Sequence, residues 1–319
     1  MNNEQLKIGL CQIAPIWLNK EKTLQKIIDY LQQAAAEKCD LAVFGECVLS
    51  GYPFWLELTG GAAFNSEIQK EIYAHYFHEA VEIDNDDLKV ICDIAKENSM
   101  AIYLGCLERA KDRGNHSLYC TLAYINENGD ICSTHRKLMP THEERLVWAI
   151  GDGNGLKVHE LKNFHVGGLN CWENWMPLTR SAMYAQGENV HVAVWPGNLR
   201  NTADLTRHIA KESRSFVVSV SGLMRKEDIS NTLPLADKIL ENAPEIMADG
   251  GSCLSAPDGS WVIEPIVGKE AMLHATIDLA EVRKERQNFD PSGHYSRPDV
   301  MQLQVNRNRQ KIVRFKDDN

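Results

Sequence analysis

The sequence has no apolar run that approaches the length of a membrane span, no tract of basic residues and no CxxC pair. A formal net charge of −10 without a basic tract gives binding to a phosphate backbone little electrostatic support. No basic region followed by an apolar signal segment opens the chain, so export is not expected. The nine cysteines are odd in number and scattered, which favours reduced thiols over disulfides. We therefore expect a cytoplasmic protein that binds neither nucleic acid nor membrane.

What the sequence does contain is an alternation of strand and helix patterns over 319 residues, enough for one large domain or two smaller ones. Residues 7–14 alternate like a strand, apolar residues at helical spacing fill 24–35, and an apolar strand follows at 41–44. This order normally gives two parallel strands covered by a helix. Residues 190–221 repeat the same plan.

Turn signals add antiparallel pairs, so we expect a mixed sheet. The Asn-Gly pair at 128–129 and the Pro-Asp-Gly-Ser turn at 257–260 each separate two strand-like runs, and a further strand pair is expected around the Asn-Gly pair at 154–155. Residues 224–250 are polar and are predicted to form an irregular surface excursion. The other expected helices are at 67–77, at 88–95 with Asp87 as N-cap, and at 178–186, 204–215 and 279–287; the other expected strands are at 101–107, 118–125, 131–135, 164–169, 190–195, 216–221, 254–256, 261–264 and 271–277.

Cys171 lies where a strand pattern at 164–169 gives way, beyond Pro177, to a helix pattern at 178–186. A thiol at such a turn gains nucleophilicity when a helix N-terminus or a cation favours its thiolate form, and a nearby carboxylate can take its proton. The alternative is a small buried hydrophobe, the usual role of a free cysteine. The neighbours of Cys171 in space decide between these two roles.

Two other reactive side chains also follow predicted strands. Glu46 follows the strand at 41–44, at the edge where open α/β sheets gather ligand groups, although an acidic loop residue is ordinarily solvated. Lys137 follows the strand at 131–135 and begins a proline-containing segment; its alternative is a basic residue on the surface. If the three strands share a sheet edge, a thiol, a carboxylate and an ammonium group converge. That combination suits attack on an electrophilic carbon bonded to nitrogen.

Several motifs, in order along nearly the whole chain, resemble the nitrilase, or carbon–nitrogen hydrolase, superfamily and most of all its true nitrilase branch. Together these motifs are far more specific than any one of them. A departure is Gly45, where a proline often precedes the glutamate in relatives. The motifs are Phe44-Gly45-Glu46, Gly51-Tyr52-Pro53, His135-Arg136-Lys137-Leu138, Pro140-Thr141-His142, Glu144-Arg145, Gly151-Asp152-Gly153, Asn170-Cys171-Trp172-Glu173-Asn174 and the segment 290–299.

The resemblance implies a fold and an assembly. The fold would be a four-layer α-β-β-α sandwich, which the mixed strand pattern permits. The carbon–nitrogen hydrolase domain would occupy residues 1–290, and 291–319 would be a C-terminal tail at a subunit interface, because such a tail cannot form a core alone. The family assembles as dimers and larger spirals, so a homo-oligomer is expected. No cofactor is implied, and Cys132, His135 and His142 lack the spacing of a zinc site, so no metal is expected.

The resemblance also carries the family's catalytic residues onto this chain. Cys171 takes the place of the nucleophile, Glu46 of the base and Lys137 of the lysine. The second glutamate falls on Glu144 rather than Glu143, because the Pro-Thr-His-x-Glu-Arg pattern fixes the frame. The implied reaction hydrolyses an organic nitrile with water to a carboxylic acid and ammonia, through a cysteine thioimidate and an acyl-enzyme.

Four more residues are expected around the substrate. Tyr52, Trp172 and Trp195 are candidate walls of the pocket, with ordinary core packing as their alternative, and Glu173 is expected to orient the groups beside the nucleophile. The backbone N–H of Trp172 is expected to help Lys137 stabilise charge on the nitrile nitrogen. Aromatic walls would suit aryl or aliphatic nitriles.

Other functions remain open at this point. An amidase of the same superfamily would share the fold and the Glu-Lys-Cys triad, and a nitrile-hydrating enzyme would release the amide from the same intermediate. A cyanide-degrading relative is less favoured, because those often carry histidine where this chain has Asn174. A protein of another class, a binding or scaffold protein that keeps the sandwich without its chemistry, would not need intact Glu46, Lys137 and Cys171.

Overall fold

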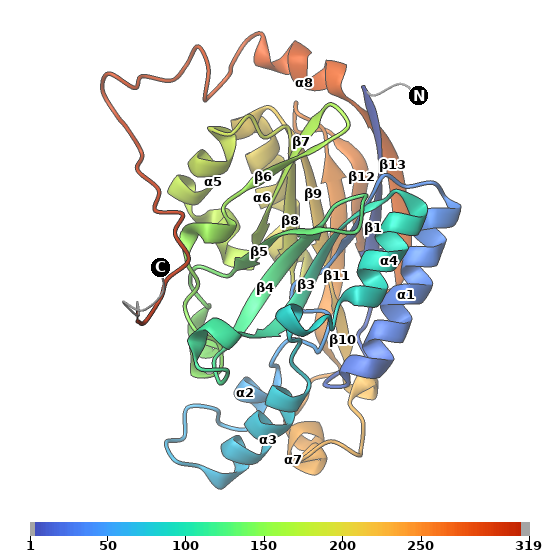
Figure 1. Ribbon diagram of the computed structural model, residues 1–319. Coiled ribbons are helices and arrows are strands. Elements are labelled where there is room, and N and C mark those ends of the chain that lie inside the picture. The colour runs from blue at the N-terminus through green and yellow to red at the C-terminus, as the bar shows by residue number, and fades with distance from the viewer. Residues whose placement is uncertain (1–3, 314–319) are drawn as a thin grey trace.

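The computed structural model describes residues 4–313, and the strands in this range form two sheets (Figure 1). The first contains β1 (Gln5–Gln12), β2 (Leu41–Phe44), β3 (Ala101–Arg109), β4 (Leu118–Ile125), β5 (Ile131–Arg136) and β13 (Ala271–Asp278), in the order β13-β1-β2-β3-β4-β5. The second contains β6 (Val158–Leu161), β7 (Phe164–Asn170), β8 (Val190–Trp195), β9 (Phe216–Ser221), β10 (Leu223–Arg225), β11 (Ile246–Ser255) and β12 (Trp261–Val267). Its order is β10-β11-β9-β8-β7-β6, with β12 paired to β11.

Helices cover the outer face of each sheet. The apolar face of α1 packs with that of α4 on the first sheet, and α6 packs on the second sheet against β8 and β9. This arrangement is the four-layer α-β-β-α sandwich that the resemblance predicted, and the prediction is confirmed. The α-helices are α1 (Lys20–Ala36), α2 (Trp55–Leu58), α3 (Glu67–His78), α4 (Lys89–Asn98), α5 (Pro177–Tyr184), α6 (Leu199–Ser213), α7 (Ala236–Asn242) and α8 (Leu279–Arg286).

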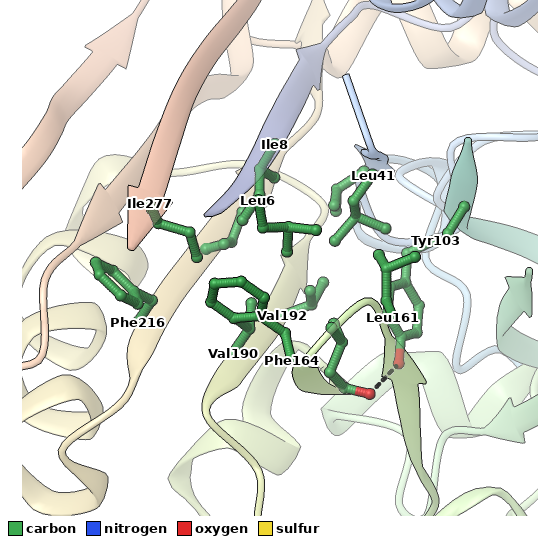
Figure 2. Packing of buried hydrophobic residues seen from close by; sticks show 14 of the residues in the cluster. Leu6, Ile8, Leu41, Tyr103, Leu161, Phe164, Val190, Val192, Phe216 and Ile277 are labelled. Carbon is green, nitrogen blue, oxygen red and sulfur yellow. Dashed lines mark hydrogen bonds between the residues drawn. The ribbon is translucent and has the colours of Figure 1, made fainter. Parts of the chain in front are cut away.

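The largest core lies between the two sheets. Figure 2 shows Leu6 and Ile8 of β1 together with Phe164 of β7 and Val190 of β8 in this layer, and all four side chains are fully buried. Burying one such side chain stabilises the fold by about 1.5–3 kcal/mol. The central strands β2, β8 and β9 are buried on both faces, because each sheet also carries a helix on its other side.

Local sequence explains why these elements begin where they do. At the start of α1, the Asn19 side chain accepts a hydrogen bond from the backbone N–H of Lys22 (3.0 Å), which caps the helix. The buried face of α1 then repeats at Ile27, Leu31 and Ala34, the spacing of one helical stripe. Beyond the helix, β2 pairs in parallel with β1, as the strand–helix–strand order predicts, and its other edge pairs in parallel with β3.

The predicted N-cap at Asp87 is wrong. Helix α4 begins after Leu88 without a side-chain cap. The Asp87 carboxylate instead accepts hydrogen bonds from Lys20 Nζ (2.9 Å) and from the backbone N–H of Glu82 (3.0 Å). A distant cation therefore takes the carboxylate that the local pattern assigned to the helix.

Two further predictions in the middle of the chain are also wrong. Residues 154–155 lie in a short 3-10 helix, Gly153–Gly155, because Asp152 accepts a hydrogen bond from the backbone N–H of Asn154 (3.1 Å). The hairpin turn lies later, between β6 and β7, where Lys162 has a left-handed φ of 55°. The excursion predicted at 224–250 contains most of β10, all of α7 and the first half of β11.

The tail after α8 carries no helix or strand as far as residue 313. It runs along the side of the sandwich near α5 and returns toward β5 (Figure 1). There Arg309 forms an ion pair with Asp152 (2.9 Å), and the backbone N–H of Gln310 donates to the same carboxylate (2.9 Å). Across residues 4–313, none of the helices is both long and apolar enough to cross a membrane.

Candidate active site

Three loops meet where strands of the two sheets end, and each supplies one predicted catalytic residue. Glu46 follows β2 and Lys137 follows β5, both in the first sheet, while Cys171 follows β7 in the second. The backbone N–H of Glu46 donates to the carbonyl of Trp195 (3.2 Å), at the end of β8. This bond ties the Glu46 loop of one sheet to the strand beside β7 in the other.

The Lys137 ammonium lies between two carboxylates. Its Nζ is 2.9 Å from Glu46 Oε1 and 2.7 Å from Glu144 Oε2, and all three side chains are at most 1% exposed. The backbone N–H of Lys137 donates to the carbonyl of Cys120 on β4 (2.8 Å), which holds the lysine against the sheet. Charges this deeply buried need partners, and here each carboxylate shares the same cation.

Glu144 is placed by its own turn. It lies in a short 3-10 helix, His142–Leu146, and its Oε2 accepts the backbone N–H of Thr141 (2.6 Å) in a capping box. Its other oxygen, Oε1, accepts a hydrogen bond from the hydroxyl of Tyr52 (2.8 Å). Burial and the charge of Glu144 raise the pKa of the Tyr52 hydroxyl well above its ordinary value, so that hydroxyl keeps the proton it donates.

Cys171 begins the 3-10 helix Cys171–Trp175 with a φ of 44°, in the left-handed region. A residue with a Cβ in such a conformation costs about 1–3 kcal/mol, so the surrounding structure must hold it there. Ligand atoms of Cys171, Glu46 and Glu144 lie within 4.8 Å of one another. The structure therefore brings together the four residues predicted to be catalytic.

The electrostatics of this cluster divide its members into a protonated thiol and a carboxylate ready to accept a proton. Burial and then the charge of Glu46 raise the pKa of the Cys171 thiol well above its ordinary value, although Lys137 and a hydrogen bond from the backbone N–H of Trp172 lower it. Burial raises the pKa of Glu46 to about 7, with Lys137 opposing and Glu144 adding to the shift.

Two details complete the proton chemistry of the cluster. Glu46 Oε2 is buried and has no hydrogen-bond partner among the described residues, so it can accept a proton. Burial lowers the pKa of the Lys137 ammonium, but interactions with the thiolate form of Cys171 and with the Glu46 and Glu144 carboxylates outweigh burial and hold that pKa well above its ordinary value. Lys137 is therefore a fixed positive charge beside the thiol.

Glu173 links the segments that carry Lys137 and Cys171. Its carboxylate accepts the backbone N–H of Asn170 (2.7 Å), just before the cysteine, and that of Leu138 (2.6 Å), just after the lysine. His135 Nε2 lies 2.9 Å from the same carboxylate. Burial opposes ionisation, but His135 and these backbone N–H groups lower the pKa of Glu173 below its ordinary value. The fully buried Glu173 carboxylate thus contacts the backbone on both sides of the site, next to Lys137 and next to Cys171.

The three aromatic residues predicted as pocket walls lie in different surroundings. Tyr52 is part of the cluster through Glu144. Trp172 is half exposed and lines a largely apolar hollow of about 510 Å³ together with Met139, Pro140, Thr141, His142, Arg145, Trp175 and Met176. Trp195 is fully buried in a cluster that contains Cys171 as well as residues of α6, and its Nε1 donates to Ser219 Oγ (3.3 Å). Full burial in this cluster favours core packing for the Trp195 side chain.

Two residues of the site were not found from the sequence. The Cys120 thiol on β4 donates to Glu46 Oε1 (3.5 Å), and the Trp148 ring lies with its centroid 5.6 Å from Lys137 Nζ. Neither stands in a motif that marks it. Cys120 is one apolar position of a buried strand, and only the antiparallel pairing of β4 with β5 brings it beside the loop of Lys137.

The thiol and the two carboxylates are also types of group that bind metal ions. Lys137 already contacts both carboxylates, so a metal ion between them would meet the ammonium at close range. The chemistry of this donor set therefore fits a lysine-centred ion cluster better than a metal site.

Comparison with known proteins places this geometry in a family. The sequence model of carbon–nitrogen hydrolases matches residues 7–287. The chain belongs to the carbon–nitrogen hydrolase family. It is 32% identical over 314 residues to "Nitrilase 2" of an unknown prokaryotic organism, covering 98% of this chain and 96% of that protein. It is 33% identical over 307 residues to an "Aliphatic nitrilase" of Sinorhizobium fredii strain HH103, covering 94% and 96%.

The solved structure of a carbon–nitrogen hydrolase from Helicobacter pylori G27 has the same fold, with a TM-score of 0.67 at 19% identity over 92% of this chain and 96% of that one. As a carbon–nitrogen hydrolase, the protein is an enzyme that cleaves carbon–nitrogen bonds.

The glycine at position 45, where relatives often have proline, is explained by the backbone packed around it. A Cβ at Gly45 would lie 3.0 Å from the backbone nitrogen of Gly222 and 3.1 Å from the Trp195 carbonyl.

Proposed function

We propose that this carbon–nitrogen hydrolase is a nitrilase, which converts an organic nitrile and two waters to a carboxylic acid and ammonia. The observation that carries the proposal is the buried Cys171 thiol beside Glu46, a carboxylate with one unpartnered oxygen and a pKa raised to about 7. A base of that pKa is matched to proton transfer near neutral pH. Full-length similarity to proteins named as nitrilases supports a nitrile as the substrate.

In the first step, Glu46 Oε2 accepts the thiol proton while the Cys171 sulfur attacks the nitrile carbon. One electron pair of the triple bond moves to nitrogen, which takes the proton back from Glu46 and leaves a thioimidate. Lys137 and the backbone N–H of Trp172 stabilise the charge that develops on this nitrogen. Removing one such preorganised donor costs about 3–4 kcal/mol of transition-state stabilisation.

Water completes the reaction in two further steps. Glu46, with Glu144 positioning the water, removes a proton from the first water as its oxygen adds to the thioimidate carbon. Glu46 passes that proton to the nitrogen, which gives a tetrahedral adduct with one hydroxyl and one amino group. As the carbon–nitrogen bond breaks, the hydroxyl proton is transferred through Glu46 to the nitrogen, ammonia leaves, and a thioester remains on Cys171. A second water then adds to the thioester, the carbon–sulfur bond breaks, and the acid leaves as sulfur regains its proton. Expulsion of Cys171 from the first adduct would instead release the amide.

The apolar hollow lined by Trp172, the residue that follows Cys171 in the sequence, supports a substrate with an apolar side chain. Trp172, Trp175 and Met176 form an apolar wall, and Met139 faces the same space. We propose that aliphatic or aryl nitriles place their side chain against this wall while Tyr52 and Glu173 hold the catalytic groups in position.

Product analysis tests the proposal. Ammonia, acid and amide are measured separately from a panel of aliphatic, arylaliphatic and aromatic nitriles, cyanide and short amides. The variants are Cys171→Ala and, as a matched control, Cys132→Ala, whose thiol is exposed. We expect acid and ammonia from nitriles, abolished by Cys171→Ala and retained by Cys132→Ala. Turnover of amides or cyanide alone would replace the proposal with the corresponding relative, and absence of any turnover that depends on Cys171 would favour a binding protein.

We also propose that the enzyme works in the cytoplasm as a homo-oligomer, a dimer or a larger spiral, with residues 1–290 as the hydrolase domain and 291–319 as a tail at the subunit interface. Exposed apolar side chains support this role for the tail: Tyr295, Val300 and Met301 are each at least 60% exposed, as is Leu178 on α5. Light scattering of the full chain and of a chain ending at residue 290 tests it. A purely monomeric full chain would overturn the proposed assembly.

A further inference from the structure

Besides Glu173 and His135, a second buried pair of a carboxylate and a histidine is connected to the turn that carries Cys171. Glu188, in the loop before β8, and His191, on β8, are both fully buried, and Glu188 Oε1 lies 3.0 Å from His191 Nδ1. Gly167 on β7, the register partner of His191, leaves room for the pair, because a Cβ at that position would collide with the Glu188 carboxylate. A buried carboxylate and imidazole are costly unless the fold uses them, and the reaction steps above do not.

The other nitrogen of His191 faces the turn of the nucleophile. His191 Nε2 lies 2.8 Å from Asn174 Oδ1, and Asn174 Nδ2 donates to the carbonyl of Cys171 (2.8 Å) and, at longer range, to that of Leu169 (3.4 Å). Because both amide hydrogens of Asn174 point to carbonyls, its Oδ1 must accept, and His191 Nε2 must carry a hydrogen. Glu188 at Nδ1 holds the imidazole in the orientation that presents this hydrogen.

The chain of bonds therefore ends on the backbone of Cys171. That residue has the left-handed φ of 44°, which needs external support. Asn174 supplies the support by binding the Cys171 carbonyl, and Arg180 Nη1 holds the carbonyl of Asn174 itself (2.7 Å). A change at Glu188 or His191 would free the Asn174 amide and let the cysteine turn relax.

We propose that Glu188 and His191 are positioning residues: through Asn174 they hold the Cys171 backbone so that its sulfur faces Glu46 and Lys137. Neither residue touches the reacting atoms. This inference rests on the proposed role of Cys171 as nucleophile. Small errors in the placement of a nucleophile lower the rate of attack much more than they lower the binding of substrate, so the effect belongs in kcat rather than KM.

The test compares four variants of the full-length protein. Glu188→Ala and His191→Ala break the chain of bonds, whereas Glu188→Gln keeps it, because the glutamine amide can donate to His191 Nδ1. The matched control is His159→Ala, which removes a part-buried histidine on β6 whose Nε2 bonds Ser133 (2.7 Å) away from the cysteine turn. The rate of Cys171 alkylation by iodoacetamide is measured by mass spectrometry, with thermal unfolding and, on a nitrile substrate, kcat and KM.

We expect Glu188→Ala and His191→Ala to lower the alkylation rate of Cys171 and kcat by about tenfold or more, with a much smaller change in KM. Glu188→Gln is expected to stay close to wild type, and His159→Ala to lose stability without losing alkylation rate. The inference is overturned if the two alanine variants alkylate like wild type, or if Glu188→Gln falls as far as Glu188→Ala, since bulk packing alone would then explain the pair.

The test does not depend on the folding of the alanine variants or on a known substrate. If the alanine variants do not fold, Asn174→Asp, which keeps the volume but cannot donate to the Cys171 carbonyl, takes their place with the same expected loss of alkylation rate. Alkylation needs no substrate, so its rate tests the positioning role even if the panel of nitriles shows no turnover. Failure of wild-type Cys171 to alkylate at all would instead overturn its proposed role as nucleophile.

Discussion

Lys137 Nζ lies 2.7 Å from Glu144 Oε2 in a region where both side chains are only 1% exposed. Because Glu46 approaches the same ammonium within 2.9 Å, one lysine compensates two buried carboxylates. The cation is thus needed for the fold of the site as well as for its chemistry, since two like charges at this depth repel each other strongly without it.

Replacing this lysine is expected to damage stability and activity together. Lys137→Met should lower the free energy of unfolding by about 3–5 kcal/mol, the cost of leaving buried charges without a partner, and nearly abolish turnover. Urea unfolding at neutral pH measures the first effect. Lys20→Met is the control: its ion pair with Asp87 is 30% exposed on each side and should cost no more than about 1 kcal/mol. Equal losses in the two variants would contradict the expectation.

The pH dependence of the reaction should report Glu46. The base must be ionised to take the thiol proton, so kcat/KM should fall as the pH decreases through about 7, the raised pKa of Glu46. The Cys120 thiol donates a hydrogen bond to this carboxylate and lowers its pKa. Cys120→Ala should therefore move the acid limb of the profile to higher pH, while Cys253→Ala, a buried thiol bonded to Thr206, should leave it in place. A limb that stays fixed or moves to lower pH in Cys120→Ala would exclude this role.

Glu173 should make the stability of the fold depend on pH at the acid end. Its pKa in the folded state is lowered below 4.5, so its ionised form contributes stability that is present above 4.5 and is lost as the pH falls through the lower folded value. Glu173→Gln should remove this dependence and lower the free energy of unfolding at neutral pH by about 1–3 kcal/mol. Unfolding of both proteins between about pH 6 and about pH 3 measures it. Glu227 is exposed, so Glu227→Gln serves as the control and should follow the wild type. If the free energies of unfolding of wild type and Glu173→Gln changed in parallel with pH, the stabilising role of ionised Glu173 would be refuted.

The sequence predicted the elements that short-range patterns determine. The bounds of β2, β8 and β9 agree with the predicted strands. The strand ends at Glu46, Lys137 and Cys171 also meet, although β7 lies in the second sheet and the three strands do not share the one sheet edge that the prediction assumed. These predictions succeed because apolar runs and turn residues act over a few positions. The meeting of the strand ends depends on the topology of the two sheets, which the family motifs supplied.

What the sequence could not show are contacts between distant residues. The Tyr52 hydroxyl and Glu144 are 92 positions apart, and Cys120 and Glu46 are 74 apart. No local pattern distinguishes a carboxylate that caps its own helix from one that a remote cation takes, which is why the prediction for Asp87 failed. The sequence also could not predict a positioning role for Glu188 and His191, because that role depends on the contact between His191 on β8 and Asn174.

The last prediction concerns the end of the tail. Asp152, the aspartate of the Gly151-Asp152-Gly153 motif, accepts hydrogen bonds from Arg309 Nη1 (2.9 Å) and from the Gln310 backbone (2.9 Å), while Arg309 Nη2 donates to the Thr134 carbonyl on the edge strand β5 (3.0 Å). Arg309→Ala should release the tail, so that the Gln310 amide exchanges its hydrogen faster and trypsin cleaves the tail sooner.

A matched variant distinguishes the loss of the Arg309 contacts from the loss of any other arginine in the tail. Arg297→Ala removes an exposed side chain whose ion pair in the described part of the chain is with the nearby Asp299. This variant should leave both the exchange of the Gln310 amide and the cleavage of the tail nearly unchanged. If both variants loosened the tail equally, or if neither did, the attachment would lie outside the Asp152 contacts. If only Arg309→Ala does so, the Gly151-Asp152-Gly153 motif also anchors the C-terminal segment. This anchor lies close to the site in the sequence, because Thr134 is on β5 and Lys137 directly follows that strand.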